Sequence, residues 1–241
     1  MKLFRNTELS GVHSGPPLFK EINVNNDYTD ITVVLDRSGS MQSIKSDVEG
    51  GFDAFIKKQR ELPGLCKVTL HQFDTIHDTV YTAVAVQAVE KLNLEPRGGT
   101  ALYDALGRAI NSTGARLRTM DPERRPGKVL FVVITDGMEN ASREFTRETV
   151  KAMVKEQTSK YSWDFMYLGA NQDAVFTAEG LGILATKAAT FGYSGAGAAA
   201  AFTATANYVT ASRGAADIVS FQSNSINALD RKSLADTVAK Q

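Results

Sequence analysis

Cysteine is almost absent from this sequence of 241 residues, and histidine is scarce. The single cysteine, Cys66, has no partner for an internal disulfide, which is typical of proteins from a reducing compartment. The three histidines and Cys66 show none of the spacings, such as HExxH or paired CxxC motifs, that hold zinc. The sequence therefore argues against both a zinc site and a fold held together by disulfides.

Long apolar runs and a net charge are also lacking. No stretch of about 18 consecutive apolar residues occurs, and residues 1–20 contain no apolar signal core. Lys and Arg together number 27, as do Asp and Glu, so no overall basic field attracts nucleic acid or an acidic membrane. We expect a cytoplasmic protein that binds neither nucleic acid nor membrane.

Apolar residues make up 43% of the chain, and they fall into alternating strand-like and helix-like segments. Continuous apolar runs at 30–36 and 128–137 are typical of central strands in a parallel sheet that is covered on both faces. Helical spacing of apolar residues follows the first run, at 42–60. Two further runs, 66–73 and 77–86, are joined by a link short enough for an antiparallel hairpin.

This alternation predicts an α/β fold with a doubly wound, mostly parallel central sheet, one antiparallel edge strand and helices on both faces. Changes in composition divide the chain into three segments. Residues 1–28 are predicted to form an extended arm, and residues 29–185 the α/β domain. Residues 186–241 form an Ala- and Gly-rich extension that we expect to be mainly helical, packed on the domain or on a neighbouring subunit.

Polar side chains follow the two most apolar strands at the point where each strand ends. Asp36 is followed by Ser38 and Ser40, and Asp136 ends the second run. Thr100 comes after two glycines, at the start of another predicted helix. Because ligands of open α/β sheets bind at the carboxyl ends of the strands, we expect these five side chains to meet. Hard oxygen donors without Cys or His suit Mg²⁺, with Mn²⁺ and Ca²⁺ as alternatives.

The motifs "DRSGS", "GGT" and "ITDG" occur in this order, and together they resemble the metal-ion-dependent adhesion site of von Willebrand factor A (VWA) domains. The resemblance covers roughly residues 28–180 and matches the family pattern at all five positions. It implies a Mg²⁺ ion, bound by the serines and sometimes the threonine, with the aspartates often acting through water. It also implies a protein partner whose Glu or Asp completes the metal shell.

The longer phrases around these motifs look most like stand-alone bacterial or phage-encoded members of the family. Many such bacterial proteins work beside an AAA+ ATPase of the MoxR type, which the resemblance makes a candidate partner. Charged residues beside the metal loops, Arg37, Arg97 and Glu139, are candidates for partner contacts, or else solvated loop charges. Asp104 lies one turn into the helix after Thr100, where it could bond loop backbone or water near the metal, or face solvent.

Other interpretations compete with a metal-dependent binding module. Asp36 and Ser40 could simply cap the first helix, but this explains neither Asp136 nor the Gly-Gly-Thr motif. The chain could be a structural component of a larger assembly such as a phage particle, with arm and tail contacting neighbouring subunits. That role is compatible with an intact metal site, and it would place the protein in a virion.

Enzymatic interpretations are weaker. Phosphoesterases of the haloacid dehalogenase type also present an aspartate after a buried strand, but they resemble DxD, and the second position here is Ser38. A GxGxxA pattern begins at Gly195, yet no clear strand precedes it, which argues against a dinucleotide site. We therefore expect no enzymatic activity and assign no catalytic residue.

Overall fold

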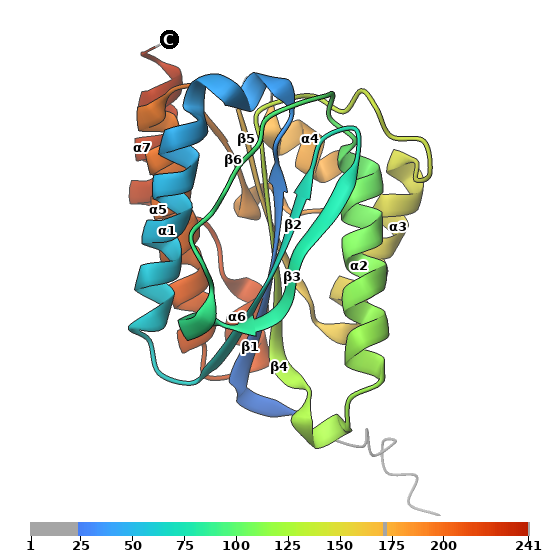
Figure 1. The fold of residues 1–241 in the computed structure, drawn as a ribbon. Helices are drawn as coiled ribbons and strands as arrows, with labels where there is room; N and C mark the ends of the chain where they lie inside the picture. The colour runs from blue at the N-terminus through green and yellow to red at the C-terminus, as the bar shows by residue number, and fades with distance from the viewer. Residues whose placement is uncertain (1–23, 171–172, 241) are drawn as a thin grey trace, which may run out of the picture.

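A six-stranded sheet runs through the middle of the computed structural model, which describes residues 24–170 and 173–240 (Figure 1). Its strands are β1 (Asn25–Asp36), β2 (Leu65–Phe73), β3 (His77–Ala85), β4 (Pro126–Thr135), β5 (Asp164–Ala170) and β6 (Ala188–Phe191). Their order is β3-β2-β1-β4-β5-β6, and the edge strand β3 is antiparallel to its neighbour while the other pairs are parallel. The predicted fold class is confirmed.

β1 lies inside the sheet, with a strand on either side and buried side chains on both faces. It pairs in parallel with β2 and β4, and its residues from Tyr28 to Asp36 are buried. In the pairing with β4, Leu35 lies opposite Ile134. Since the two strands run side by side in the same direction, Asp36 and Asp136 leave the sheet at the same edge.

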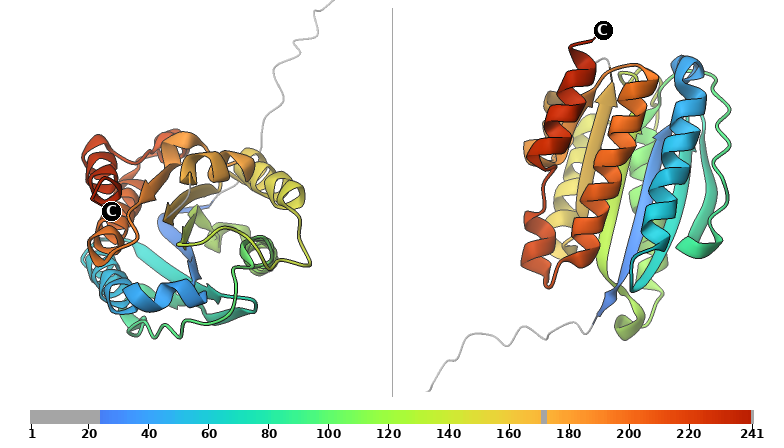
Figure 2. Two further views of the ribbon diagram at one scale, coloured as in Figure 1. Left: turned by 90° about the horizontal axis from the view of Figure 1, so that it is seen from above. Right: turned by 90° about the vertical axis from the view of Figure 1, so that its left-hand side faces the viewer.

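Helices cover both faces of the sheet (Figures 1 and 2). They are α1 (Lys45–Arg60), α2 (Leu102–Arg118), α3 (Arg147–Tyr161), α4 (Ala174–Gly180), α5 (Gly195–Gly214), α6 (Ile218–Ser223) and α7 (Ala228–Val238). A short 3₁₀ helix, η1 (Gly39–Ile44), leads from the loop after β1 into α1. Helices α1 and α5 lie on one face, and α2, α3 and α4 lie on the other.

Alternate side chains of β1 enter two separate hydrophobic cores. Ile31, Val33 and Leu35 pack in the core that contains α1 and α5, whereas Val34 packs in the core that contains α2, α3 and α4. This period of two is the geometry of a strand with both faces buried. The strand that carries Asp36 is thus fixed from both sides.

The predicted extension, residues 186–241, completes the sheet and one of its cores. β6 pairs with β5 as the last strand, and α5 packs along α1, with Phe202 and Val209 in the same core as β1. α7 lies against β6, where Gly192 N donates a 2.8 Å hydrogen bond to Thr237 Oγ1. The tail is mainly helical and packs on its own chain, and it contains a strand that the sequence did not predict.

The GxGxxA pattern directly follows this unpredicted strand β6, contrary to the expectation that no strand precedes it. Its first two glycines nevertheless face groups of the chain itself. A Cβ on Gly195 would lie 2.6 Å from the Asp47 carboxylate, and a Cβ on Gly197 would lie 1.7 Å from the carbonyl oxygen of Gly192. Close packing explains these glycines, and the Asp47 carboxylate beside the first residue of α5 would repel a phosphate there.

The predicted arm, residues 1–28, overlaps the sheet, since β1 already begins at Asn25. Residues 1–23 of that arm lie outside the described residues. Within the ranges 24–170 and 173–240, no helix is both long enough and apolar enough to cross a membrane.

Candidate metal centre

The five predicted site residues all lie at the carboxyl edge of the parallel strands. Asp36 ends β1, Ser38 and Ser40 lie in the loop and η1 that follow, and Asp136 comes directly after β4. Thr100 lies two residues before the first residue of α2. The crossovers of the sheet therefore bring together segments that are up to a hundred residues apart in the sequence.

Direct contacts join the serines to Asp136. Ser38 Oγ lies 3.1 Å from Ser40 Oγ, and both hydroxyls point to the same carboxylate oxygen. The distance to Asp136 Oδ1 is 3.3 Å from Ser38 Oγ and 2.9 Å from Ser40 Oγ. Three oxygens from two loops thus converge on one point.

The Asp36 carboxylate accepts a hydrogen bond at each of its two oxygens. Its Oδ1 accepts a 2.6 Å hydrogen bond from Ser38 N, and its Oδ2 accepts a 2.5 Å bond from Thr135 Oγ1. Burial raises the pKa of Asp36 to about 7, although both hydrogen bonds oppose the shift and nearby Asp136 adds to it. The site disfavours a second negative charge unless a cation offsets it.

The Asp136 carboxylate shows more directly that a cation would stabilise this site. Its Oδ2 is buried and has no hydrogen-bond partner among the residues that the structure describes. Burial also raises the pKa of this carboxyl, although the hydrogen bonds from Ser40 and Ser38 act in the opposite direction. A buried carboxylate oxygen without a partner is costly, and a metal ion is one of the groups that satisfies it.

Backbone hydrogen bonds tie the loop after β1 to the loop before α2. Gly39 N donates to Gly98 O over 3.2 Å, and Arg97 N donates to Arg37 O over 2.9 Å. Gly98 has a φ of +64°, a left-handed conformation that glycine adopts without strain. This explains why the Gly-Gly-Thr motif needs a glycine here.

Thr100 is fixed from its other side by the loop after β4. Thr100 N donates a 2.9 Å hydrogen bond to Asn140 Oδ1, and Asn140 N donates a 3.0 Å bond back to Thr100 O. The Thr100 hydroxyl lies 3.0 Å from the position that a Cβ would take at Gly137, next to Asp136. The threonine therefore borders the two-loop cluster, and its role as a metal ligand stays a prediction.

Two carboxylates organise the loop after Asp136. Asp104 accepts hydrogen bonds of 2.8 to 2.9 Å from three successive backbone N–H groups, those of Arg143, Glu144 and Phe145. Glu139 accepts from three other backbone N–H groups, those of Tyr103, Ala141 and Ser142. Asp104 thus bonds loop backbone, the first of the two roles considered for it, and Glu139 is engaged within the chain.

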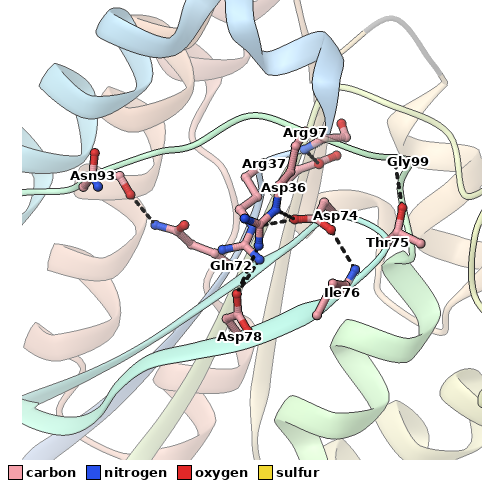
Figure 3. A network of polar contacts seen from close by, with 11 residues as sticks. Asp36, Arg37, Gln72, Asp74, Thr75, Ile76, Asp78, Asn93, Arg97 and Gly99 are labelled. Carbon is pink, nitrogen blue, oxygen red and sulfur yellow. Dashed lines mark hydrogen bonds and ion pairs between the residues drawn. The ribbon is translucent and has the colours of Figure 1, made fainter.

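The two arginines beside the site form a charged cluster with the β2–β3 hairpin (Figure 3). Arg37 Nε lies 2.7 Å from Asp74 Oδ2, and its side chain is only 7% exposed. Arg97 Nε reaches the same oxygen over 3.0 Å, but its side chain is 51% exposed. The Arg37 side chain is therefore buried in an ion pair within the chain. Of the three charged residues predicted as candidates for partner contacts, Arg97 is the one with a half-exposed side chain.

Asp74, which accepts from both arginines, is the residue of this cluster that sequence reasoning missed, although a signal was present. It follows β2 as Asp136 follows β4, so three neighbouring strands each end at or next to an aspartate. Ile76 and Met138, on two of the same loops, are also new; their side chains are 57% and 69% exposed. No sequence pattern distinguishes such exposed apolar residues from ordinary loop residues.

The donors fit a hard divalent cation better than any other group. Two buried carboxylates and three hydroxyls offer oxygen ligands and no sulfur or imidazole, which suits Mg²⁺ or Mn²⁺. In the described ranges, no group of three or more His, Cys, Asp or Glu residues is placed to hold a metal ion. With Asp36 and Asp136 alone, this edge does not form such a group either, so it is a candidate metal centre through its carboxylate and hydroxyl oxygens together.

Comparison of the sequence with protein-family models and with curated proteins finds no match. Comparison of the fold with solved structures finds VWA proteins. A von Willebrand factor type A protein from Catenulispora acidiphila superposes with a TM-score of 0.51 at 12% identity, over 76% of this chain and 43% of its own. The chain has the VWA fold.

Two further structures share this fold. Proximal thread matrix protein 1 from the mussel byssus has a TM-score of 0.54 at 16% identity, over 76% of this chain and 46% of its own. The pilus adhesin SpaC from Lactobacillus rhamnosus GG has a TM-score of 0.55 at 14% identity, over 76% of this chain and 30% of its own. The present chain thus spans less than half the length of these proteins.

Proposed function

We propose that this protein is a metal-dependent protein-interaction module. Asp36, Ser38, Ser40, Thr100 and Asp136 would hold one Mg²⁺ ion, with Mn²⁺ or Ca²⁺ as alternatives. The observation that carries the proposal is the buried Asp136 Oδ2, which lacks a hydrogen-bond partner among the described residues while two hydroxyls converge on the same carboxyl group. A bound cation supplies the positive charge that this group of oxygens calls for.

A carboxylate is the partner group that fits such a site best. The protein supplies only two acidic side chains, so a bound divalent ion is at most neutralised and favours an anionic oxygen from outside. Exposed Ile76 and Met138 lie on loops of the same edge and offer apolar contacts around that oxygen. We therefore propose a protein partner that presents a Glu or Asp, such as a MoxR-type AAA+ ATPase in the cytoplasm.

The proposal includes the absence of catalysis at this site. The two serine hydroxyls contact each other and Asp136, so they serve as ligands in this arrangement and not as activated nucleophiles. An assembly role for the tail has less support, because α5 and α7 bury their apolar residues against the chain's own core. The proposed function therefore depends on the metal centre and its rim.

Metal titration by calorimetry tests the first half of the proposal. Wild-type protein should bind one Mg²⁺ ion, and Asp136→Asn, which keeps the shape but removes the charge, should abolish the heat of binding. Thr100→Val, which removes one hydroxyl, should weaken binding about tenfold, equivalent to about 1.4 kcal/mol. Glu156→Gln on α3, whose side chain is 48% exposed, is the matched control and should bind like wild type.

Affinity capture from extracts of the source organism, with Mg²⁺ or with EDTA, tests the second half. The proposal expects capture of a partner by wild type and Glu156→Gln in Mg²⁺, and its loss in EDTA or with Asp136→Asn. Equal capture in EDTA would mean that recognition does not use the metal centre. An absence of metal binding by wild type would refute the proposal at its first step.

A further inference from the structure

Arg37 lies in the sequence between two predicted metal ligands, Asp36 and Ser38, yet its own side chain turns to the β2–β3 hairpin (Figure 3). Its guanidinium group contacts two carboxylates. Nε lies 2.7 Å from Asp74 Oδ2, and Nη2 lies 2.5 Å from Asp78 Oδ2. The Arg37 side chain is only 7% exposed, and its partner Asp74 is 2% exposed, so this ion pair lies in the interior.

The hairpin that receives Arg37 is itself fixed to the other metal loop. Asp74 O accepts a 2.9 Å hydrogen bond from Ala101 N, next to Thr100. Asp74 Oδ2 also accepts from Arg97 Nε over 3.0 Å, and Arg97 N donates to Arg37 O over 2.9 Å. A closed set of contacts therefore connects the loop of Asp36 and Ser38, the hairpin, and the loop of Thr100.

Arginine suits this place better than lysine. Its planar guanidinium group presents several N–H donors in a fixed fork, so it can serve two carboxylates from different positions at once. A lysine would keep the charge but offer a single ammonium group on a flexible stem. The geometry thus depends on the shape of the cation as well as on its charge.

We propose that Arg37 is a positioning residue for the metal centre. Its ion pairs with Asp74 and Asp78 hold the Asp36–Ser40 loop against the Thr100 loop, so that the hydroxyls and carboxylates converge before any metal arrives. Arg37 raises the metal affinity of the site without touching the metal. This inference rests on the proposed function, because it concerns the same site.

Simple electrostatics makes the opposite prediction for loss of this charge. A cation one residue from two metal ligands repels a divalent ion, and its removal leaves Asp78 and Asp74 more negative around the site. On charge alone, Arg37→Met should therefore bind Mg²⁺ more tightly than wild type. If Arg37 positions the loop, Arg37→Met should bind Mg²⁺ more weakly, so the sign of the change separates the two effects.

The charge-conserving variant Arg37→Lys provides the second comparison. We expect Arg37→Lys to bind Mg²⁺ about tenfold more weakly in calorimetry. Loss of a group that orients metal ligands typically lowers metal affinity by about this factor. The matched control is Arg116→Lys at the far end of α2, where Arg116 makes a similar forked pair with Asp30, at 2.9 and 2.7 Å. That control should leave the Mg²⁺ affinity at the wild-type value. If Arg37→Met does not fold, this comparison decides alone.

Hydrogen exchange of the metal-free protein in EDTA gives a readout that needs no metal. Arg37→Lys should speed the exchange of residues 36–41, whereas Arg116→Lys should leave that segment unchanged. If wild type binds no Mg²⁺ but this difference persists, the proposed function fails, and Arg37 still holds the Asp36–Ser40 loop but has no role in metal binding. If Arg37→Met binds Mg²⁺ as tightly as wild type, or Arg37→Lys matches Arg116→Lys in both affinity and exchange, the inference is overturned.

Discussion

His71 lies on β2 with its ring stacked on that of His77, with 4.9 Å between the ring centroids. Its Nδ1 lies 3.0 Å from both His77 Nε2 and Thr79 Oγ1. Burial lowers the pKa of His71 to about 3, and the charges of His77 and Arg116 act in the same direction. The folded protein therefore keeps this imidazole neutral under mildly acidic conditions.

This shift predicts how acid affects stability. The unfolded chain protonates His71 near its ordinary pKa of 6.5, whereas the folded protein protonates it only near 3. Between these values the unfolded state binds more protons, so the free energy of unfolding falls as the pH falls, by up to about 1.4 kcal/mol per unit. Urea unfolding from about pH 7 to about pH 5 should show a shallower fall for His71→Gln than for wild type.

Carboxylates protonate in both proteins over the same range, so the difference between the two slopes isolates His71. His77 faces the same ring, and burial also lowers its pKa, so part of the slope should remain in His71→Gln. Parallel curves for wild type and His71→Gln would show that the buried ring takes no part in acid unfolding.

The site residues illustrate what a sequence reveals at this scale. Asp36 and Asp136 could be predicted because each ends a continuous apolar strand, and parallel strands share an edge. The ion pairs of Arg37 could not be predicted, since the contact with Asp78 depends on where the β2–β3 hairpin places its residues relative to the loop. The pairing of β2 with β3 is irregular near Leu70, and no short-range sequence pattern records such an irregularity.

At the scale of elements, the contact between α1 and α5 explains one of two adjacent glycines in α1. Phe202 of α5 packs edge-to-face on Phe52 of α1, with 6.3 Å between the ring centroids. A Cβ on Gly51 would lie 2.4 Å from Cδ2 of Phe202, whereas a Cβ on Gly50 would meet nothing within 4 Å. The two positions therefore differ in packing but share the same helix.

Alanine at each glycine should change stability in opposite directions. Gly50→Ala should stabilise the protein by up to about 1 kcal/mol, because alanine is the better helix former. Gly51→Ala gains the same propensity but forces Phe202 to move within a packed core, which costs about 1 to 3 kcal/mol. Chemical unfolding of both variants measures the difference, and equal stabilisation by both would show that α5 adapts freely to α1.

The element that sequence reasoning missed, β6, has a physical explanation. The strand has only four residues, "AATF", and is poor in β-branched side chains, so local propensity does not favour a strand there. Tertiary contacts stabilise the strand instead, because β6 pairs with β5 and is covered by α7. α5 was easier to predict as a helix, yet its partner α1 could not be named, because small residues leave no pronounced apolar stripe.

At the scale of the whole molecule, the tail is part of the folding unit. Residues 186–241 supply one strand of the sheet and the helix that covers α1. Without them, the apolar face of α1 and one edge of β5 would be exposed to water. The division predicted at residue 185 thus lies between elements that share one core.

A protein truncated after residue 185 should therefore lose cooperative folding. Exposure of Phe52 and Phe55, now buried, removes a large part of the hydrophobic stabilisation on that face. Circular dichroism should show no sharp thermal transition, and size exclusion should show aggregation. A shorter truncation that removes residues 239–241 leaves the described helices complete and should melt like the full chain. A sharp transition in the longer truncation, near that of the full chain, would contradict this account.

β1 also sets an axis for experiments that attach the protein to a surface. The strand has 12 residues, so its first residue lies about 40 Å from the metal centre. α7 instead ends at the same end of the molecule as that centre (Figure 1). A sensor chip that holds the protein near residue 24 would leave the metal edge facing solution, whereas attachment after α7 would turn that edge towards the chip.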